Sequence, residues 1–319
     1  MQAPILAVVI PCYNEEEVLS ATLTRLLDVM SDLEKRNVIS DRSFIYTVDD
    51  GSKDRTFNII EEFHNRYPEK VRGLSFVKNF GNQKAILAGL LEIKKFEFDC
   101  CITIDADLQQ DENKIEEFIE KFNEGNQLVY GIKNDRNDTS FIKKFFALSF
   151  YKLMNILGAK TYQNHSEFRL IGRSVTDILS EYKETNIFLR GIFQEMGNNP
   201  AIVYYNVKKR AAGVSKFSLF DLFSLAIQGI TSFSTVPLRL VTFTGLLMSF
   251  SAFIVGLSVI IEKLFFPSHF LPGWATTVTV ISFIGGVQIF CLGILGEYMG
   301  QIYTEVKSRP RYIVSKELK

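Results

Sequence analysis

The chain has 319 residues, enough for one large domain or for a domain with appendages. Lys and Arg total 36, as do Asp and Glu, so no overall positive field favours nucleic acid as a partner. The four cysteines have no C-x-x-C spacing and no nearby His, which indicates reduced, mostly buried thiols in a cytosolic setting.

Up to about Gly131, strand-like segments alternate with helix-like ones, which predicts an α/β fold with a mostly parallel sheet covered by helices. In such sheets ligands bind at the carboxyl ends of the strands, so the residues just after each strand matter most. Strands are predicted at Ile5–Ile10, Phe44–Val48, Val71–Val77, Cys100–Ile104 and Gln127–Tyr130, and helices at Glu15–Lys35, from about Asp54, at Asn82–Lys94 and at Glu112–Phe122.

Two strand ends carry groups that suit a nucleoside. After the first strand, Tyr13 and the acidic residues that follow could stack on and hydrogen-bond a base, although Asn14 as a helix N-cap explains the same residues. After the second strand, Asp49 and Asp50 precede a glycine turn. They could accept from a base N–H or from ribose hydroxyls, and a turn-and-capping role stays equally open.

A third group follows the strand Cys100–Ile104 and has the sequence Asp-Ala-Asp-Leu-Gln. The i, i+2 spacing of Asp105 and Asp107 puts both carboxylates on one side of an extended chain. There they could share Mg²⁺ or Mn²⁺, with positions left open for diphosphate oxygens, whereas Asp111 fits a capping role better. Each group has a structural explanation by itself, but three in order at successive strand ends favour a common site.

Two later segments, Leu240–Ile261 and Trp274–Leu295, are long and apolar enough to cross a membrane. The first has no charge and as a helix would span about 33 Å, which matches the hydrocarbon core; a pair of buried core helices is the alternative. The positive-inside rule places both chain ends in the cytoplasm. The basic residues outside the pair are Lys208, Lys209, Arg210, Lys216, Arg239, Lys307, Arg309 and Arg311.

The segment Phe217–Phe233 has apolar residues on one helical face and polar residues on another. It predicts an amphipathic helix in the membrane interface, with packing on the soluble domain as the alternative. The chain is therefore expected to comprise a cytoplasmic catalytic domain (1–216), an amphipathic juxtamembrane helix (217–235), a transmembrane hairpin (236–298) and a cytoplasmic tail (299–319).

As a set, the motifs resemble those of family 2 glycosyltransferases of the GT-A fold, in the branch that acts on polyprenyl phosphates. That branch includes dolichyl-phosphate mannose synthase and the bactoprenol glucosyltransferases. The resemblance covers nearly the whole chain. The matching segments are VVIPCYNEEE (Val8–Glu17), VDDGSKDRT (Val48–Thr56), KNFGNQ (Lys78–Gln83), DADLQQ (Asp105–Gln110), EFRL (Glu167–Leu170), RAAGVSKF (Arg210–Phe217) and YTEVKSRPRY (Tyr303–Tyr312).

The resemblance implies roles for individual residues. It implies a nucleoside site, a metal site that uses Mg²⁺ or Mn²⁺, an acceptor-phosphate site, and three catalytic residues, Asp107, Glu167 and Arg210. The nucleotide site would comprise Pro11, Tyr13, Glu15, Asp49 and Asp50, with Lys133 near the donor phosphates; the metal site Asp105, Asp107 and Gln109; and the acceptor site Arg169, Arg210, Ser215 and Lys216.

Three positions depart from the family pattern. Glu167 stands where relatives usually have Asp, so its role as a base is open; Val207 takes a position that is often Arg, leaving Lys208 and Lys209 to supply the charge; Phe193 replaces a frequent Trp. These departures bear on the geometry of the acceptor, not on the reaction class.

The resemblance implies a membrane enzyme of the bacterial inner membrane that moves one sugar from a UDP-hexose such as UDP-glucose to undecaprenyl phosphate, with inversion. The acceptor phosphate, with a second pKa of about 6, is already a nucleophile and hardly requires a base. The metal would stabilise the leaving diphosphate. Alternatives are GDP-mannose as donor, a non-catalytic nucleotide-sugar-binding scaffold, and a processive synthase, which the absence of a Q-x-x-R-W motif disfavours. A homo-oligomer is left open.

Overall fold

The computed structural model describes residues 3–134, 165–185, 187–196, 200–208, 235–265 and 273–319. The chain falls into two compact units, of which one contains the sheet, its helices and residues 309–319, and the other contains two long helices. The predicted amphipathic helix Phe217–Phe233 lies outside the described residues. The division into domains stays a prediction.

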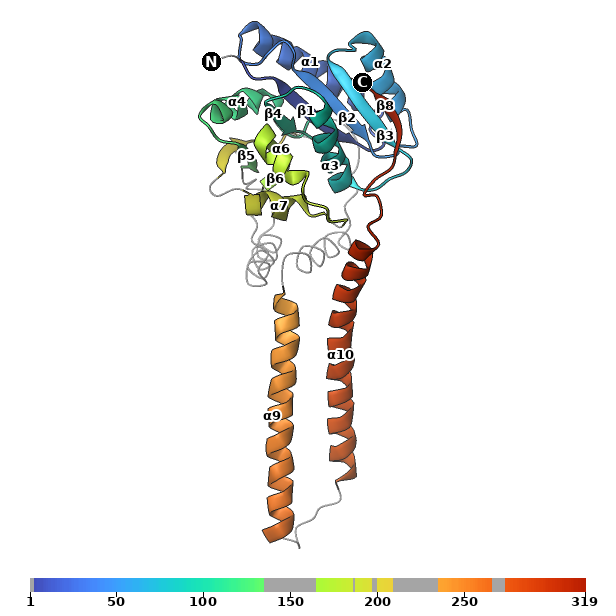
Figure 1. The fold of residues 1–319 in the computed structure, drawn as a ribbon, viewed down its shortest axis with the longest axis vertical. Coiled ribbons are helices and arrows are strands. Elements are labelled where there is room, and N and C mark those ends of the chain that lie inside the picture. Colours follow the sequence, from blue (N-terminus) through green and yellow to red (C-terminus); the bar gives the residue numbers. More distant parts are fainter. Residues whose placement is uncertain (1–2, 135–164, 186, 197–199, 209–234, 266–272) are drawn as a thin grey trace. The chain divides into compact units, whose positions relative to one another are not determined.

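An eight-stranded sheet forms the centre of the first unit (Figure 1). The strands are β1 (Leu6–Cys12), β2 (Phe44–Asp49), β3 (Val71–Phe76), β4 (Cys100–Thr103), β5 (Leu128–Lys133), β6 (His165–Gly172), β7 (Ala201–Tyr205) and β8 (Val314–Leu318). Their order across the sheet is β7-β5-β6-β4-β1-β2-β3-β8. Among these described strands only β6 and β8 run antiparallel to their neighbours, which confirms the predicted mostly parallel α/β sheet.

Helices connect the strands and cover the sheet. They are α1 (Leu19–Lys35), α2 (Thr56–Arg66), α3 (Asn82–Glu92), α4 (Ile115–Asn123), α6 (Arg173–Leu179) and α7 (Leu189–Met196), with 3₁₀ turns at Ile93–Lys95 and Glu112–Lys114. The predicted elements before Gly131 are all present, with ends that move by a few residues. The elements from β6 onward in this unit were not predicted.

The core is built on both faces of β1, in which every residue is buried. Because successive side chains of a strand point to opposite faces, Leu6, Val8 and Ile10 pack in one cluster with apolar residues of α1 and α4. Val9 faces α3 instead, where a Cβ on Gly89 would lie 2.3 Å from Val9 Cγ1. This close approach of helix and strand requires glycine at position 89. A parallel strand covered on both faces accounts for the unbroken apolar run that predicted it.

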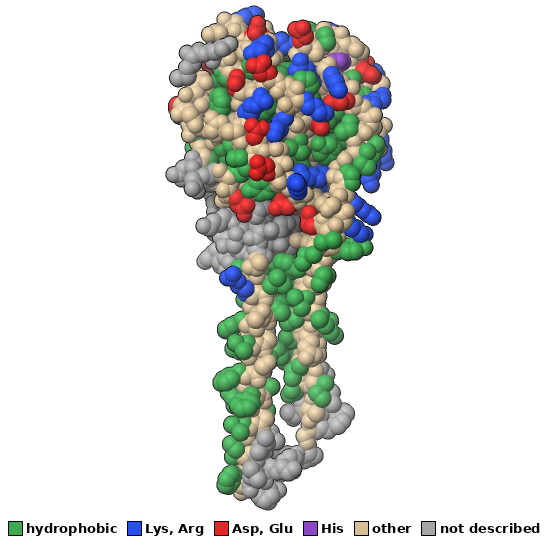
Figure 2. Space-filling model, viewed as in Figure 1, with side chains coloured by type: hydrophobic (Ala, Val, Ile, Leu, Met, Phe, Trp, Pro, Cys, Tyr) green, Lys and Arg blue, Asp and Glu red, His purple; other side chains and the backbone are tan. Residues whose placement is uncertain are grey.

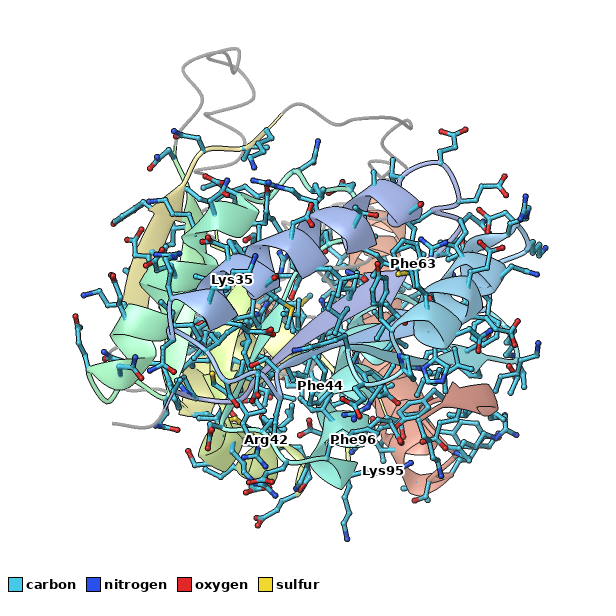
Figure 3. The ribbon with its side chains drawn as sticks, turned by 90° about the horizontal axis from the view of Figure 1, so that it is seen from above. Lys35, Arg42, Phe44, Phe63, Lys95 and Phe96 are labelled. Atoms are coloured by element: carbon cyan, nitrogen blue, oxygen red, sulfur yellow. The ribbon has the colours of Figure 1, made fainter. Side chains whose placement is uncertain are left out.

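An aromatic cluster closes the sheet at the amino end of β2. The rings of Phe44 and Phe96 meet edge to face, with centroids 5.6 Å apart, and lie side by side in Figure 3. The Arg72 guanidinium lies 4.7 Å and 4.3 Å from the centroids of these two rings. Since Phe44 is the first residue of β2, the cluster lies at the end of the strands away from the predicted site.

The second unit contains α9 (Val236–Phe265) and α10 (Trp274–Val306). Two stretches, Val236–Ser258 and Phe283–Val306, are long and apolar enough to cross a membrane, and none of their apolar window is buried in the structure. Figure 2 shows apolar side chains along the two helices, whereas charged side chains gather on the sheet unit. A pair of core helices would have these side chains covered, so the exposure favours the membrane interpretation.

Candidate active site

The carboxyl ends of β4, β1 and β2 lie next to one another because these strands are parallel neighbours in the sheet. Cys12 pairs with Asp49, and Val9 pairs with Thr103. The three groups singled out in the sequence therefore start from one edge of the sheet, as the topology of an open α/β sheet requires of a ligand site.

The loops after β1 and β2 are tied to each other through Asn14. Its backbone N–H donates to Ser52 Oγ (2.9 Å), and its side-chain oxygen accepts from the Lys53 N–H (2.9 Å). Helix α1 begins only at Leu19, with no side-chain cap, so the interpretation of Asn14 as an N-cap is wrong. Pro11 is buried in β1, and Tyr13 and Glu15 are half-buried on either side of Asn14.

Asp49 is only 1% exposed, and each of its carboxylate oxygens accepts one hydrogen bond, from strand β3 or from the turn after β2. Oδ2 accepts from Ser75 Oγ at 2.6 Å, and Oδ1 accepts from the Ser52 N–H at 3.1 Å. Because each carboxylate oxygen can accept two hydrogen bonds, these contacts leave acceptor capacity for a base or a ribose.

Asp50 is 2% exposed and binds the loop that follows β3. It accepts hydrogen bonds from the N–H groups of Phe80 (2.6 Å) and Gly81 (2.9 Å). Burial raises the pKa of Asp50, and these two backbone donors act against that rise. The next residue, Gly51, has φ +66°, and a Cβ there would lie 2.3 Å from the Lys78 carbonyl carbon, so the turn and the β3 loop pack backbone to backbone.

The loop after β4 is held by a glutamine that the sequence analysis did not single out. The Asp105 N–H donates to Gln110 Oε1 (2.8 Å), and Gln110 Nε2 donates to Asp105 Oδ2 (2.6 Å). Asp107 accepts from the Gln109 N–H at 3.1 Å. Leu108 between them has φ +51°, a left-handed conformation that is unusual for leucine. The cap predicted for Asp111 is confirmed, since it accepts from the Asn113 N–H.

Acidic groups crowd around Asp105. Burial, then Glu167 and then Asp107 raise its pKa to about 7, against the opposing fields of Lys133 and Arg190. Lys133 is the exposed last residue of β5. The neighbouring carboxylates of Asp105 and Asp107 suit a divalent cation, and oxygen ligands suit Mg²⁺ or Mn²⁺.

A cation on Asp105 and Asp107 would not be enclosed by protein alone. In the part of the chain that the structure describes, no three His, Cys, Asp or Glu side chains come together as a metal cluster. Magnesium in proteins commonly takes one or two carboxylates and completes its shell with water and substrate phosphates. The donor set therefore fits a metal that a diphosphate helps to coordinate; Gln109, the third predicted ligand, is half-buried.

Glu167, on β6, is the centre of an ion-pair network. Its carboxylate pairs with Arg169 and accepts from Arg190 Nε (2.8 Å) and Gln83 Nε2 (3.1 Å). The Gln83 side-chain oxygen in turn accepts from the Leu189 N–H, which ties α3 to α7. Both oxygens of the Glu167 carboxylate accept from cationic or amide donors. Such a carboxylate is better suited to hold the arginine side chains in position than to remove a proton from a substrate.

Arg169 is the buried member of this network, 1% exposed, with its guanidinium 4.9 Å from the centroid of the Phe193 ring. Its Nε and Nη1 have no hydrogen-bond partner among the described residues. A phosphate could reach Arg169 only after the side chains that cover it rearrange. The other residues predicted for the acceptor phosphate, Arg210, Ser215 and Lys216, lie outside the described residues.

Lys208, expected to supply charge for the acceptor, is already engaged. Its Nζ pairs with Glu112 Oε2 (2.5 Å) and Asp111 Oδ1 (3.0 Å), and its N–H donates to the Gln109 carbonyl (2.9 Å). Arg25 of α1 also pairs with Glu112 (2.9 Å). Lys208 therefore fastens the chain after β7 to the loop that carries Asp105 and Asp107.

Several residues that shape the site were not predicted from the sequence. Gln83 and Gln110 stood inside quoted motifs, so motif membership was a usable signal for them, but Arg190 lay in a region where no pattern was found. Its contact with Glu167 depends on two elements that are distant in sequence.

Comparison with known proteins identifies the family. Residues 7–179 match Glycosyl transferase family 2, and residues 236–302 match the GtrB C-terminal hairpin. The chain belongs to glycosyltransferase family 2. This confirms the resemblance stated from the motifs and the prediction of an enzyme that transfers a glycosyl group.

Relatives align over nearly the whole of this glycosyltransferase. An uncharacterized glycosyltransferase of Bacillus subtilis, YkoT, is 44% identical and the alignment covers 99% of this chain and 92% of the relative. The SfII prophage-derived bactoprenol glucosyl transferase of Shigella flexneri is 38% identical, over 98% of this chain and 97% of the relative. Glucosyl-3-phosphoglycerate synthase from Mycobacterium tuberculosis, solved with Mn²⁺, UDP and phosphoglyceric acid, has a TM-score of 0.45 at 17% identity, over 72% of this chain and 76% of that one.

Proposed function

We propose that this enzyme transfers one hexose, glucose in the first instance, from a UDP-sugar to undecaprenyl phosphate at the cytoplasmic face of the bacterial inner membrane. One observation carries the proposal. Asp105 and Asp107 follow β4 on one side of β1, and Asp49 and Asp50 lie at the end of β2 on its other side, in a chain that continues into two long apolar helices. The bactoprenol glucosyl transferase of Shigella flexneri aligns along this whole arrangement.

In this proposal the donor binds across the strand ends. Tyr13, Glu15, Asp49 and Asp50 hold the nucleoside against Pro11, and Lys133 lies by the donor phosphates. Asp105, Asp107 and Gln109 hold Mg²⁺ or Mn²⁺, which acts as a Lewis acid on the leaving diphosphate. The Asp105 carboxylate must be ionised to bind the cation, and its contact with Gln110 fixes its direction.

The acceptor brings its own nucleophile. A phosphomonoester is largely a dianion near neutral pH, since its second pKa is about 6, so no side chain has to remove a proton. Glu167 would hold Arg190 and Arg169 in place rather than act as a base. Arg210, Ser215 and Lys216 would bind the lipid phosphate, since basic residues near a membrane attract anionic headgroups at about 1 kcal/mol each. The displacement inverts the anomeric carbon.

The membrane arrangement belongs to the same proposal. Residues 236–298 form a two-pass hairpin, 217–235 lie in the interface, and residues 1–216 and 299–319 are cytoplasmic, as the basic residues flanking the hairpin favour. Support comes from the uncovered apolar side chains of α9 and α10 and from the match to the GtrB hairpin.

Purified full-length protein tests the function directly. We would incubate it with undecaprenyl phosphate, Mg²⁺ or Mn²⁺, and radiolabelled UDP-glucose, UDP-galactose or GDP-mannose, and count label extracted into butanol. Label from UDP-glucose supports the proposal. Label from GDP-mannose alone would mean that the donor is GDP-mannose and not a UDP-sugar. No label from any donor, with nucleotide-sugar binding intact, would favour the scaffold alternative.

A further inference from the structure

The C-terminal strand β8 covers the free edge of β3. Gly73 pairs with Leu318 and Ser75 with Lys316, antiparallel. Two further bonds extend the contact: the Val77 N–H donates to the Ile313 carbonyl (3.1 Å), and Ser315 Oγ donates to the Ser75 carbonyl (3.0 Å). The last residues of the chain, which follow the second apolar helix in sequence, are therefore part of the sheet that carries the site.

The strand that β8 covers and the loop after that strand supply hydrogen bonds to both acidic side chains of the nucleoside site. Ser75 of β3 donates to Asp49, and the N–H groups of Phe80 and Gly81, in the loop after β3, donate to Asp50. A shift of β3 would therefore disturb the contact of Asp49, and a shift of the loop would disturb the contacts of Asp50.

An aromatic chain leads from the tail to the same loop. Tyr312 stacks on Phe76, with centroids 5.1 Å apart and an interplanar angle of 20°. Phe76 meets Phe80 edge to face, at 5.6 Å and 87°. Phe80 is the residue whose N–H binds Asp50. The stack thus holds Phe80 in place, and the Phe80 N–H in turn holds Asp50, which is predicted to bind the nucleoside.

From these contacts we infer that Tyr312 and β8 position the donor site: they hold β3 and its loop in the geometry in which Asp49 and Asp50 accept the nucleoside. This inference rests on the proposed function. Tyr312 acts through Phe76 and Phe80 and does not itself touch the donor. The C-terminal segment that contains Tyr312 and β8 is therefore expected to affect nucleotide affinity. If it only completed the sheet, nucleotide affinity would not depend on it.

The test uses full-length protein in detergent and three variants. Tyr312→Ala removes the stack, and Tyr312→Phe retains it. The matched control is Tyr67→Ala, because Tyr67 is 42% exposed at the end of α2 and its hydrogen bonds in the structure are made by its backbone. Titration calorimetry with UDP and Mg²⁺, and with GDP in parallel, gives the nucleotide affinity. Steady-state assays give KM for the donor, KM for the lipid acceptor, and kcat.

Tyr312→Ala should weaken nucleotide binding and raise the donor KM by about two- to tenfold, the range expected for the loss of one aromatic pair. The acceptor KM and kcat should stay near wild type, and Tyr312→Phe and Tyr67→Ala should bind nucleotide as wild type does. Wild-type affinity in a folded Tyr312→Ala protein overturns the inference. If wild-type protein binds neither nucleotide, the proposed function of the site fails instead.

A second measurement needs no variant. Because coupling between two sites is reciprocal, saturating UDP should slow amide hydrogen exchange at Val77 and in β8 of the wild-type protein. Equal exchange with and without bound UDP overturns the inference even if Tyr312→Ala fails to fold.

Discussion

The substitution Glu167→Gln would test the network beneath the candidate site. Glu167 and Arg169 are both buried, and Glu167 also binds Arg190 at 2.8 Å. The substitution removes the negative charge that balances a guanidinium with almost no exposure, while the glutamine oxygen can still accept a hydrogen bond. Removing one partner of a buried ion pair costs about 3–5 kcal/mol, and we expect the lower end here.

Such a loss should lower the melting temperature by about 6–12 °C, at about 2–4 °C per kcal/mol for a unit of this size. Thermal unfolding followed by circular dichroism in detergent measures it. The matched control is Glu124→Gln, because Glu124 is also paired with a basic residue, Lys121 (3.0 Å), but on the surface. Exposed pairs contribute about 0–1 kcal/mol, so this variant should melt near wild type. Equal melting of the two variants would refute the view that Glu167 neutralises buried Arg169.

Three further predictions concern the strand ends. Because the pKa of Asp105 is raised to about 7, the metal-free folded state keeps a proton that the unfolded state has lost, so the contribution of Asp105 to stability falls as the pH rises from the ordinary pKa of an aspartate towards 7. Mn²⁺ needs the ionised carboxylate, so it should raise the melting temperature more at pH 8 than at pH 6. An equal rise at both pH values would contradict the assignment of Asp105 as a metal ligand. Asp107→Asn should lower kcat by at least about 100-fold, because the metal would no longer stabilise the leaving group. Asp28→Asn, on the exposed face of α1, should leave kcat unchanged. Turnover of radiolabelled donor by the two variants measures the difference. Gly51→Ala should weaken UDP binding and destabilise the protein by about 1 kcal/mol or more, since its φ is +66° and Lys78 occupies the space, and retained affinity in calorimetry would argue against that packing.

The sequence predicted the strands that are buried on both faces, because their apolar runs are continuous and end at polar turns. The sequence misjudged the start of α1 because the residues after Asn14 contact a distant part of the chain: the Glu15 N–H donates to Thr56 Oγ1, at the start of α2, at 2.8 Å. No pattern within residues 15–35 reveals that contact.

Strands β6 and β8 could not be predicted from their own composition. β6 carries the buried charges of Glu167 and Arg169 in the sheet interior, and these are tolerated only because each is the other's partner. β8 has the polar sequence VSKEL, and its conformation is set by pairing with β3. Long-range partners decide both strands, whereas single-sequence patterns report local preference.

The sequence predicted which types of side chain form the candidate site, but not the contacts that hold them in place. Residue types and their order at strand ends predicted acidic groups at one edge of the sheet. The side-chain amide of Gln110 holds Asp105 in place, and the ammonium of Lys208 pairs with the buried Glu112. Neither contact follows from spacing, because an amide or an ammonium has many candidate partners until the fold brings one within reach.

The polar outermost strand has a consequence for association between copies of the protein. An exposed strand edge presents unpaired backbone groups, which invite pairing between neighbouring molecules. β8 places Lys316 and Glu317 on the last described strand of the sheet, and without β8 the edge of β3 would be exposed. A protein shortened before Val314 should therefore aggregate in detergent even where its hairpin remains intact.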